Sequence, residues 1–269
     1  MVWRPASEWL SRGANLVGRA TIGRAFGLAV VCAIALAAAS CGDDNAASSD
    51  DEMVPFAQEP GLHAQVLESR NMPYAIDIPT TYNSSTDLPL LLALHWGGEV
   101  TPYIGGQFLT TLVLPALENL NAIIVAPDAV SGNWSNATAE ADLLALMDAI
   151  KLNYHTASGK TIIVGYSMGG AGVWYLAERH PERFAGGIAI AASPPADVLD
   201  VSWSVPFFLI HSREDEVIDF TGTTTAYNGL QEKGLDVSLL ALTGPGHYDI
   251  SDYIAPLQTA VSWVETQWE

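Results

Sequence analysis

The chain has 269 residues and a formal net charge of −19 at pH 7, from 11 Lys and Arg against 30 Asp and Glu. A surface this acidic disfavours nucleic acids and other anionic polymers as partners. Both cysteines, Cys32 and Cys41, lie near the N-terminus, so residues 42–269 have no thiol for a disulfide or for redox chemistry. The sequence has no close set of metal ligands and no phosphate-binding glycine loop, so we expect no cofactor and no metal.

The first 40 residues are predicted to be a targeting segment, not part of the fold. Four arginines precede an uncharged stretch, 25–40, and small residues lead into Cys41. This pattern resembles a bacterial lipoprotein signal, which predicts a lipid anchor on Cys41 and a place in the cell envelope, facing the periplasm or exterior. An uncleaved membrane anchor is the alternative, although a span needs roughly 20 apolar residues. The acidic, Ala- and Ser-rich segment 41–59 is predicted to be a flexible tether.

From residue 60 onward, short apolar segments alternate with amphipathic ones. The predicted strands are 63–68, 74–78, 88–94, 122–126, 161–165, 184–191, 205–210 and 237–242. The predicted helices are 107–120, 137–154, 168–180, 222–233 and 251–267. This order predicts one α/β domain, 60–269, with a mainly parallel eight-stranded sheet and helices on both faces. The link 192–204 is too short for a helical cap domain, so we expect an open site.

The most specific motif lies between the fifth predicted strand and the helix that follows it. Residues 165–169 read Gly-Tyr-Ser-Met-Gly, a Gly-x-Ser-x-Gly turn after a β-branched apolar run. In such a strand-to-helix turn the serine is strained and its hydroxyl points outward, and the glycines let the backbones pass closely. We therefore predict that Ser167 is a nucleophile; a purely structural Gly/Ser turn is the alternative.

A loop rich in carboxylates follows the predicted strand 205–210. In this arrangement the orienting acid comes after the serine, on a loop that follows a later strand. We predict that Asp215 is this acid; the alternatives on the same loop are Glu214, Glu216 and Asp219. His211 begins the loop and is assigned a structural role.

A glycine-rich turn after the last predicted strand carries His247, the predicted general base. Asp215 would accept the Nδ1 hydrogen of His247 and fix the ring tautomer, so that Nε2 can take the proton of Ser167. The other histidines precede the nucleophile or lie at strand, helix or helix-end positions, where a structural or surface role is expected.

Acyl transfer also needs N–H donors for the oxyanion of the tetrahedral intermediate. The predicted strand 88–94 is followed by His-Trp-Gly-Gly at 95–98. We assign the donors to the backbone N–H groups of Met168 and Gly97, with Trp96 as the alternative to Gly97. The predicted substrate-contacting side chains, for which packing is the alternative role, are Trp96, Trp134 and Tyr248.

The segments around Ser167, Asp215 and His247 resemble the α/β-hydrolase superfamily over nearly all of residues 60–269. Within it the chain resembles the small, lidless phospholipase/carboxylesterase and polyhydroxybutyrate-depolymerase-like esterases. The sequences that carry this resemblance are Leu-Pro-Leu-Leu-Leu-Ala-Leu-His at 88–95, Gly-Tyr-Ser-Met-Gly-Gly at 165–170 and Glu-Arg-His-Pro-Glu-Arg-Phe-Ala-Gly-Gly at 178–187.

The resemblance implies a serine carboxylesterase that forms an acyl-enzyme on a small-molecule, lipid or polymer ester. Three alternatives stay open: a serine peptidase of the same fold, a polyester (polyhydroxyalkanoate-type) depolymerase, and a binding protein on a disabled hydrolase fold.

Overall fold

The computed structural model describes residues 56–99 and 101–269. The predicted signal segment, Cys41 and most of the predicted tether lie outside these residues. The compact unit is Phe56–Glu269. Phe56 packs edge-on against Tyr154, with 6.0 Å between ring centroids, and the Tyr154 hydroxyl donates to the carbonyl of Ala57 at 2.6 Å. The packed unit therefore begins before residue 60, and the predicted tether 41–59 is too long at its C-terminal end.

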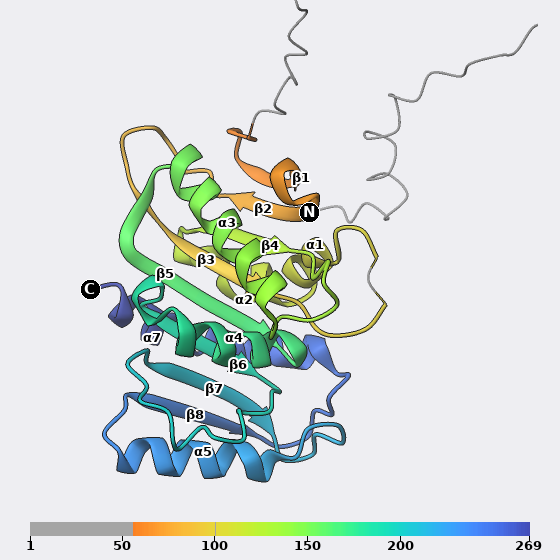
Figure 1. The fold of residues 1–269 in the computed structure, drawn as a ribbon, viewed down its shortest axis with the longest axis vertical. Coiled ribbons are helices and arrows are strands. Elements are labelled where there is room, and N and C mark those ends of the chain that lie inside the picture. The colour runs from red at the N-terminus through yellow and green to blue at the C-terminus, as the bar shows by residue number, and fades with distance from the viewer. Residues whose placement is uncertain (1–55, 100) are drawn as a thin grey trace, which may run out of the picture. The chain divides into compact units, whose positions relative to one another are not determined.

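A single eight-stranded sheet lies at the centre of this unit (Figure 1), in the order β1-β2-β4-β3-β5-β6-β7-β8. Its strands are β1 (Gly61–Leu67), β2 (Met72–Ile78), β3 (Leu88–Leu94), β4 (Ile123–Pro127), β5 (Thr156–Tyr166), β6 (Gly186–Ile190), β7 (Phe207–Ser212) and β8 (Val237–Leu242). β2 is antiparallel to both β1 and β4, and all other neighbours are parallel. The prediction of a mainly parallel sheet of eight strands is confirmed.

Helices cover both faces of the sheet. They are α1 (Ile104–Phe108), α2 (Leu114–Leu117), α3 (Ala137–Asn153), α4 (Met168–Arg179), α5 (Phe220–Glu232), α6 (Ile254–Gln258) and α7 (Val261–Gln267). Successive side chains of a strand point to opposite faces. Leu91 of β3 accordingly belongs to the core under α1, α2, α6 and α7, and Leu92 to the core under α3, α4 and α5. No helix among the described residues is long and apolar enough to cross a membrane.

Two predicted helices are interrupted. The predicted helix 107–120 is instead α1, a π-helical turn (Leu109–Val113), α2 and a final 3-10 turn (Glu118–Leu120). Pro115 in α2 has no N–H for the helical ladder, and the preceding turn widens to a π-helix. The predicted C-terminal helix 251–267 is likewise divided into a 3-10 turn (Ile250–Tyr253), α6 with Pro256 inside it, and α7.

β5 begins at Thr156, five residues earlier than predicted, and no residue of this added part is fully buried. Its polar and glycine residues hide the strand from a search for apolar runs, yet Thr156 pairs with Leu88 of β3. Further along the chain, residues 191–206 connect β6 to β7 without a helix. The described part of the chain thus has no cap domain at this position, as predicted.

Parallel strands bring the segments that follow them to one edge of the sheet. Such carboxyl-end edges are where α/β proteins bind ligands. The segments after β3, β5, β7 and β8 contain the predicted triad and oxyanion residues, and α4 starts directly after β5. The topology therefore places residues that are far apart in sequence at a single location.

Candidate active site

Ser167 occupies a strained turn between β5 and α4. Its φ of 55° and ψ of −116° lie in a region that non-glycine residues rarely adopt. The backbone must also pass very close to itself here: a Cβ on Gly165 would overlap the carbonyl of Gly169, and a Cβ on Gly169 would overlap the carbonyl of Leu94. The Ser167 amide donates to the carbonyl of Ile190 at 2.8 Å, which fixes the turn to β6.

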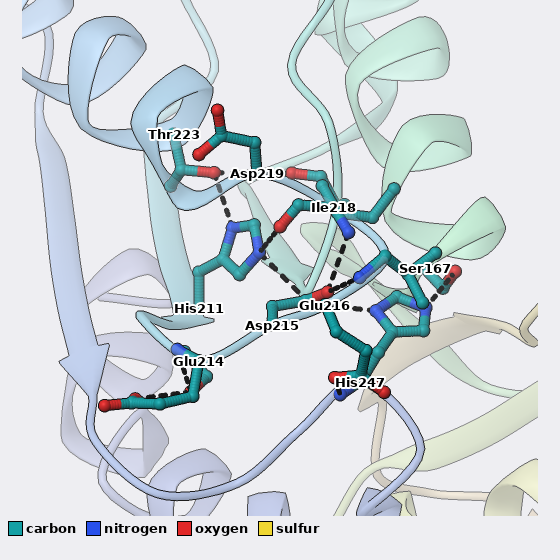
Figure 2. Close-up of polar contacts among 12 residues, drawn as sticks. Ser167, His211, Glu214, Asp215, Glu216, Ile218, Asp219, Thr223 and His247 are labelled. Carbon is teal, nitrogen blue, oxygen red and sulfur yellow. Dashed lines mark hydrogen bonds and ion pairs between the residues drawn. The ribbon is translucent and has the colours of Figure 1, made fainter.

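Ser167, His247 and Asp215 form a continuous hydrogen-bonded line (Figure 2). His247 Nε2 lies 2.9 Å from Ser167 Oγ, and His247 Nδ1 lies 2.8 Å from Asp215 Oδ2. The His247 side chain is 6% exposed and the Asp215 side chain is 0% exposed, so both are buried. A carboxylate can only accept, so Nδ1 carries the hydrogen and Nε2 is free to accept the serine proton.

Asp215 is held by its own loop. Its Oδ1 accepts the backbone N–H groups of Val217 at 2.9 Å and Ile218 at 2.7 Å. Burial by itself would raise the pKa of Asp215, but the hydrogen bonds from Ile218, His247 and Val217 outweigh it and hold that pKa below its ordinary value. Asp215 is therefore a carboxylate at neutral pH, and its orientation is fixed from two sides.

The three alternative acids bind backbone N–H groups instead of the His247 ring. Glu214 accepts from Gly244 at 3.0 Å, and Glu216 accepts from the His247 amide at 2.9 Å. Asp219 caps α5 by accepting from Thr221 at 2.9 Å. Glu214 and Glu216 thereby tie the acid loop to the histidine loop, so these alternatives have structural contacts and only Asp215 reaches the ring.

Two contacts within the site were not predicted. The Tyr166 hydroxyl donates to the carbonyl of His247 at 2.6 Å, which joins β5 to the histidine loop. His211 Nε2 lies 3.2 Å from Asp215 Oδ2, on the opposite side from His247 (Figure 2). In the sequence, the only signal for these contacts is that Tyr166 immediately precedes Ser167 and that His211 lies four residues before Asp215. Neither signal reveals where the side chain points.

The two residues predicted to supply the oxyanion donors, Met168 and Gly97, lie close together. A Cβ on Gly97 would be 3.4 Å from Met168 Sδ, so the loop after β3 runs against the start of α4. Neither the Met168 amide nor the Gly97 amide has a hydrogen-bond partner within 56–99 and 101–269. An oxyanion is stabilised by N–H groups that are free to donate, so these two amides remain the predicted donors.

His95 holds the loop that contains Gly97. Its Nε2 accepts the Ala129 amide at 3.0 Å, so the hydrogen is on Nδ1, which donates to the carbonyl of Trp96 at 2.6 Å. Burial is the main cause that lowers the pKa of His95, to about 4, so the ring is neutral near pH 7. Trp134 adds a third bond by donating from its indole N–H to the His95 carbonyl at 2.9 Å.

The predicted substrate-contacting side chains differ in exposure. Trp134 is only 1% exposed and supports the His95 loop, so its predicted contact with substrate is wrong. Trp96 is half-buried and packs edge-on against Phe108, with 5.7 Å between centroids. Tyr248 is 75% exposed and stands beside His247, with 5.5 Å between centroids. Trp96 and Tyr248 therefore remain predicted contacts, and Trp134 is a core residue.

A small hollow adjoins the first turn of α4, which follows Ser167. It has a volume of about 180 Å³ and is lined by Ser135, Ala171, Trp174, Tyr175, Glu178, Ser193 and Pro195. Ala171 lies one turn into α4, and its N–H donates to the Ser167 carbonyl at 3.0 Å. No group of three His, Cys, Asp or Glu side chains in the described part of the chain has a metal-binding arrangement.

The chain is similar to known α/β-hydrolases and esterases. A family model described as "alpha/beta hydrolase fold" matches residues 127–228, a range that contains Ser167 and Asp215. "Probable feruloyl esterase C" of Aspergillus terreus is 24% identical over 169 residues, which is 61% of this chain and 63% of that protein. This chain thus spans less than two thirds of that relative's length.

Solved structures show the same similarity in three dimensions. A thermostable esterase superposes with a TM-score of 0.62 at 20% identity, over 76% of this chain and 62% of that chain. A ferulic acid esterase superposes with a TM-score of 0.61 at 17% identity, over 77% of this chain and 97% of that chain. The strand order, the serine turn after β5 and these similarities together establish that the chain has the α/β-hydrolase fold.

Proposed function

We propose that this protein is a serine hydrolase that cleaves carboxylic esters through an acyl-enzyme. Ser167 is the nucleophile, His247 the general base and Asp215 the orienting acid. The observation that carries the proposal is the pair of hydrogen bonds from Ser167 Oγ to His247 Nε2, 2.9 Å, and from His247 Nδ1 to Asp215 Oδ2, 2.8 Å. The esterases among the similar proteins support an ester as the substrate.

In the first half of the reaction, Ser167 Oγ attacks the ester carbonyl carbon and its proton moves to His247 Nε2. Asp215, a carboxylate held by backbone N–H groups, stabilises the imidazolium that forms. The N–H groups of Met168 and Gly97 bind the oxyanion. When the tetrahedral intermediate breaks down, the imidazolium gives its proton to the leaving alcohol, and the acyl group stays on Ser167.

In the second half, a water molecule takes the place of the alcohol. His247 removes a proton from this water, which attacks the acyl carbonyl, and the same two N–H groups bind the second oxyanion. Breakdown returns the proton to Ser167 Oγ and releases the carboxylic acid. The strained turn at Ser167 keeps its hydroxyl in place through both steps, so the protein need not reorganise between them.

The test is hydrolysis of p-nitrophenyl esters from acetate to palmitate by the soluble domain and by its Ser167→Ala variant. We expect ester turnover in the wild type and a loss of at least about 1,000-fold in kcat in the variant. A peak at short chains supports a small-molecule esterase, and a peak at long chains supports a lipid or polyester substrate. Turnover that Ser167→Ala leaves unchanged contradicts the proposal.

If the wild type cleaves none of these esters, the alternatives separate by reactivity. A fluorophosphonate that labels Ser167 would then indicate a serine peptidase, and a protein that resists labelling would be a binding protein on this fold. Ser167→Ala is the matched control in both cases. It removes one hydroxyl from a half-buried side chain, so the fold is expected to be retained.

We further propose that a lipid on Cys41 anchors the protein to the bacterial cell envelope, with no nucleic-acid partner. The support is in the sequence, where small residues precede Cys41 after an arginine-rich start and an apolar stretch. Two acyl chains of the kind attached to lipoproteins give stable membrane binding. Cys41→Ser is expected to move the protein from the membrane fraction to the soluble fraction of cells, and an unchanged distribution would contradict the anchor.

A further inference from the structure

A second histidine contacts the acid of the proposed triad. His211 is the fifth residue of β7 and is 1% exposed. Its Nε2 lies 3.2 Å from Asp215 Oδ2 and 3.1 Å from the carbonyl of Ile218, and its Nδ1 lies 2.7 Å from Thr223 Oγ1 (Figure 2). Every polar atom of this buried ring therefore has a partner, and one of those partners is the triad carboxylate.

These contacts define the tautomer of His211. Nε2 faces two acceptors, the Asp215 carboxylate and the Ile218 carbonyl, so Nε2 must carry the ring hydrogen. Nδ1 then accepts from the Thr223 hydroxyl. Burial, the largest cause, lowers the pKa of His211 although Asp215 opposes this, so the ring is neutral near pH 7. His211 is thus a neutral ring and not a second cation, and its Nε2–H donates to the Ile218 carbonyl and lies beside Asp215 Oδ2.

We propose that His211 is a positioning residue for the triad, whose Nε2–H fixes the Asp215 carboxylate and takes up part of the negative charge that faces His247. This inference rests on the function proposed for Ser167, His247 and Asp215. Asp215 accepts three N–H groups, two backbone amides on Oδ1 and the His247 ring on Oδ2, and His211 Nε2 lies 3.2 Å from the same Oδ2.

Removal of the His211 donor would have two effects. The carboxylate would keep its bonds on Oδ1 but would have only His247 on Oδ2, so it could turn more easily. More negative charge would also face His247, which favours its protonated form and raises its pKa. A merely structural role of His211, as a filler at the end of β7, would produce neither a higher His247 pKa nor a selective loss in kcat.

Other ionisable groups around the two histidines stay the same in the test. Besides Asp215, these are Tyr166 of β5, Tyr253 of the turn before α6, Glu216 and Asp219 of the acid loop, and Asp249 after the histidine loop. None of them is changed by a substitution at position 211. A difference between two variants at that position can therefore be assigned to the contact with Asp215.

The chain offers a matched pair of substitutions. In His211→Gln the side-chain amide can reach the place of Nε2 and still donate to Asp215. In His211→Asn the shorter amide reaches only the place of Nδ1, beside Thr223, and the donor to Asp215 is lost. Both substitutions replace a buried imidazole by a neutral amide, so general effects on packing and polarity are shared.

The experiment is an NMR titration of the His247 ring in the wild type and in both variants, together with ester kinetics. We expect His211→Asn to raise the His247 pKa by about half a unit and to lower kcat about tenfold at unchanged KM. His211→Gln is expected to restore most of both properties. Equal His247 pKa values in all three proteins, or equal effects of the two substitutions, would overturn the proposal.

The titration needs no turnover, so it decides the role of His211 even if the ester series fails and the proposed function falls. Should His211→Asn not fold, Thr223→Val takes its place. This variant keeps the side-chain shape but removes the hydroxyl that anchors Nδ1, and the His247 pKa is expected to rise by a smaller amount. An unchanged His247 pKa in Thr223→Val would then overturn the inference.

Discussion

Replacement of Asp215 by Asn should reverse the tautomer of His247 while leaving the shape of the site unchanged. In the structure Oδ1 of Asp215 accepts the amides of Val217 and Ile218, at 2.9 and 2.7 Å. An asparagine at this position must keep its oxygen there, because its NH₂ group cannot accept from those amides. The NH₂ group then occupies the place of Oδ2, where it faces the His247 ring.

This NH₂ group is a donor, so His247 Nδ1 can be its partner only as an acceptor. The ring hydrogen moves to Nε2, which then donates to Ser167 Oγ and can no longer take its proton. The general-base step is lost although the distances stay near 2.8 and 2.9 Å. A wrong tautomer of this kind lowers kcat by about 10,000-fold, equivalent to about 5.5 kcal/mol.

The assay is steady-state ester hydrolysis by the wild type, Asp215→Asn and a matched control, Asp219→Asn. Asp219→Asn removes the same charge from the same loop, but Asp219 caps α5 and Asn is an equally good N-cap residue. We expect Asp219→Asn to stay within about twofold of the wild type. More than a tenth of wild-type kcat in Asp215→Asn, or equal losses in the two variants, would show that the tautomer of His247 does not depend on Asp215.

Three further outcomes follow from the contacts around the site. Gly169→Ala is expected to lower the free energy of unfolding by about 3 kcal/mol or more in urea titrations, because the new methyl overlaps the carbonyl of Leu94; a loss below 1 kcal/mol would contradict the close approach. Tyr166→Phe is expected to lower kcat about tenfold, because the buried His247 carbonyl loses its donor, and unchanged kinetics would show that this bond does not hold the loop. The pKa of His95 falls from 6.5 in the unfolded chain to about 4 in the folded protein. The unfolded chain therefore binds this proton at a higher pH, and the free energy of unfolding declines by about 3 kcal/mol as the pH falls from 6.5 to 4. Urea titrations at pH 7, 6 and 5 should show that the free energy of unfolding declines less with falling pH in His95→Asn than in the wild type. An equal decline in both proteins would show that His95 does not cause it.

The sequence predicts this fold well because its signals are local. β3, β6 and β7 are apolar runs buried on both faces, and such runs are recognisable without a partner. The Gly-x-Ser-x-Gly turn at 165–169 is largely local, since the strain at Ser167 and the overlap between Gly165 and Gly169 arise within five residues. The close approach of Gly169 to the carbonyl of Leu94 is not local, because Leu94 belongs to β3. The first half of β5 lacks such a signal, because it is a strand only through its pairing with β3. The π-helical turn before α2 lacks one too, because the effect of Pro115 on the preceding turn depends on the surrounding structure.

The proximity of Ser167, Asp215 and His247 could also be predicted, because loops that follow parallel strands share one edge of the sheet. The sequence could not predict which way individual side chains point. Trp134 donates to the His95 carbonyl from inside the core, and no pattern in its own segment distinguishes this from an exposed aromatic. The contact between His211 and Asp215 could not be predicted for the same reason, because the directions of both side chains depend on how the chain turns after β7.

The proposed chemistry depends above all on Ser167 being an activated nucleophile. Intact-mass and peptide mass spectrometry after treatment with a fluorophosphonate, on the wild type and Ser167→Ala, would reveal this activation without any knowledge of the substrate. We expect one adduct per wild-type chain, located on the peptide that contains Ser167, and none on the variant. An unlabelled wild type, or an adduct that persists in Ser167→Ala, would contradict it.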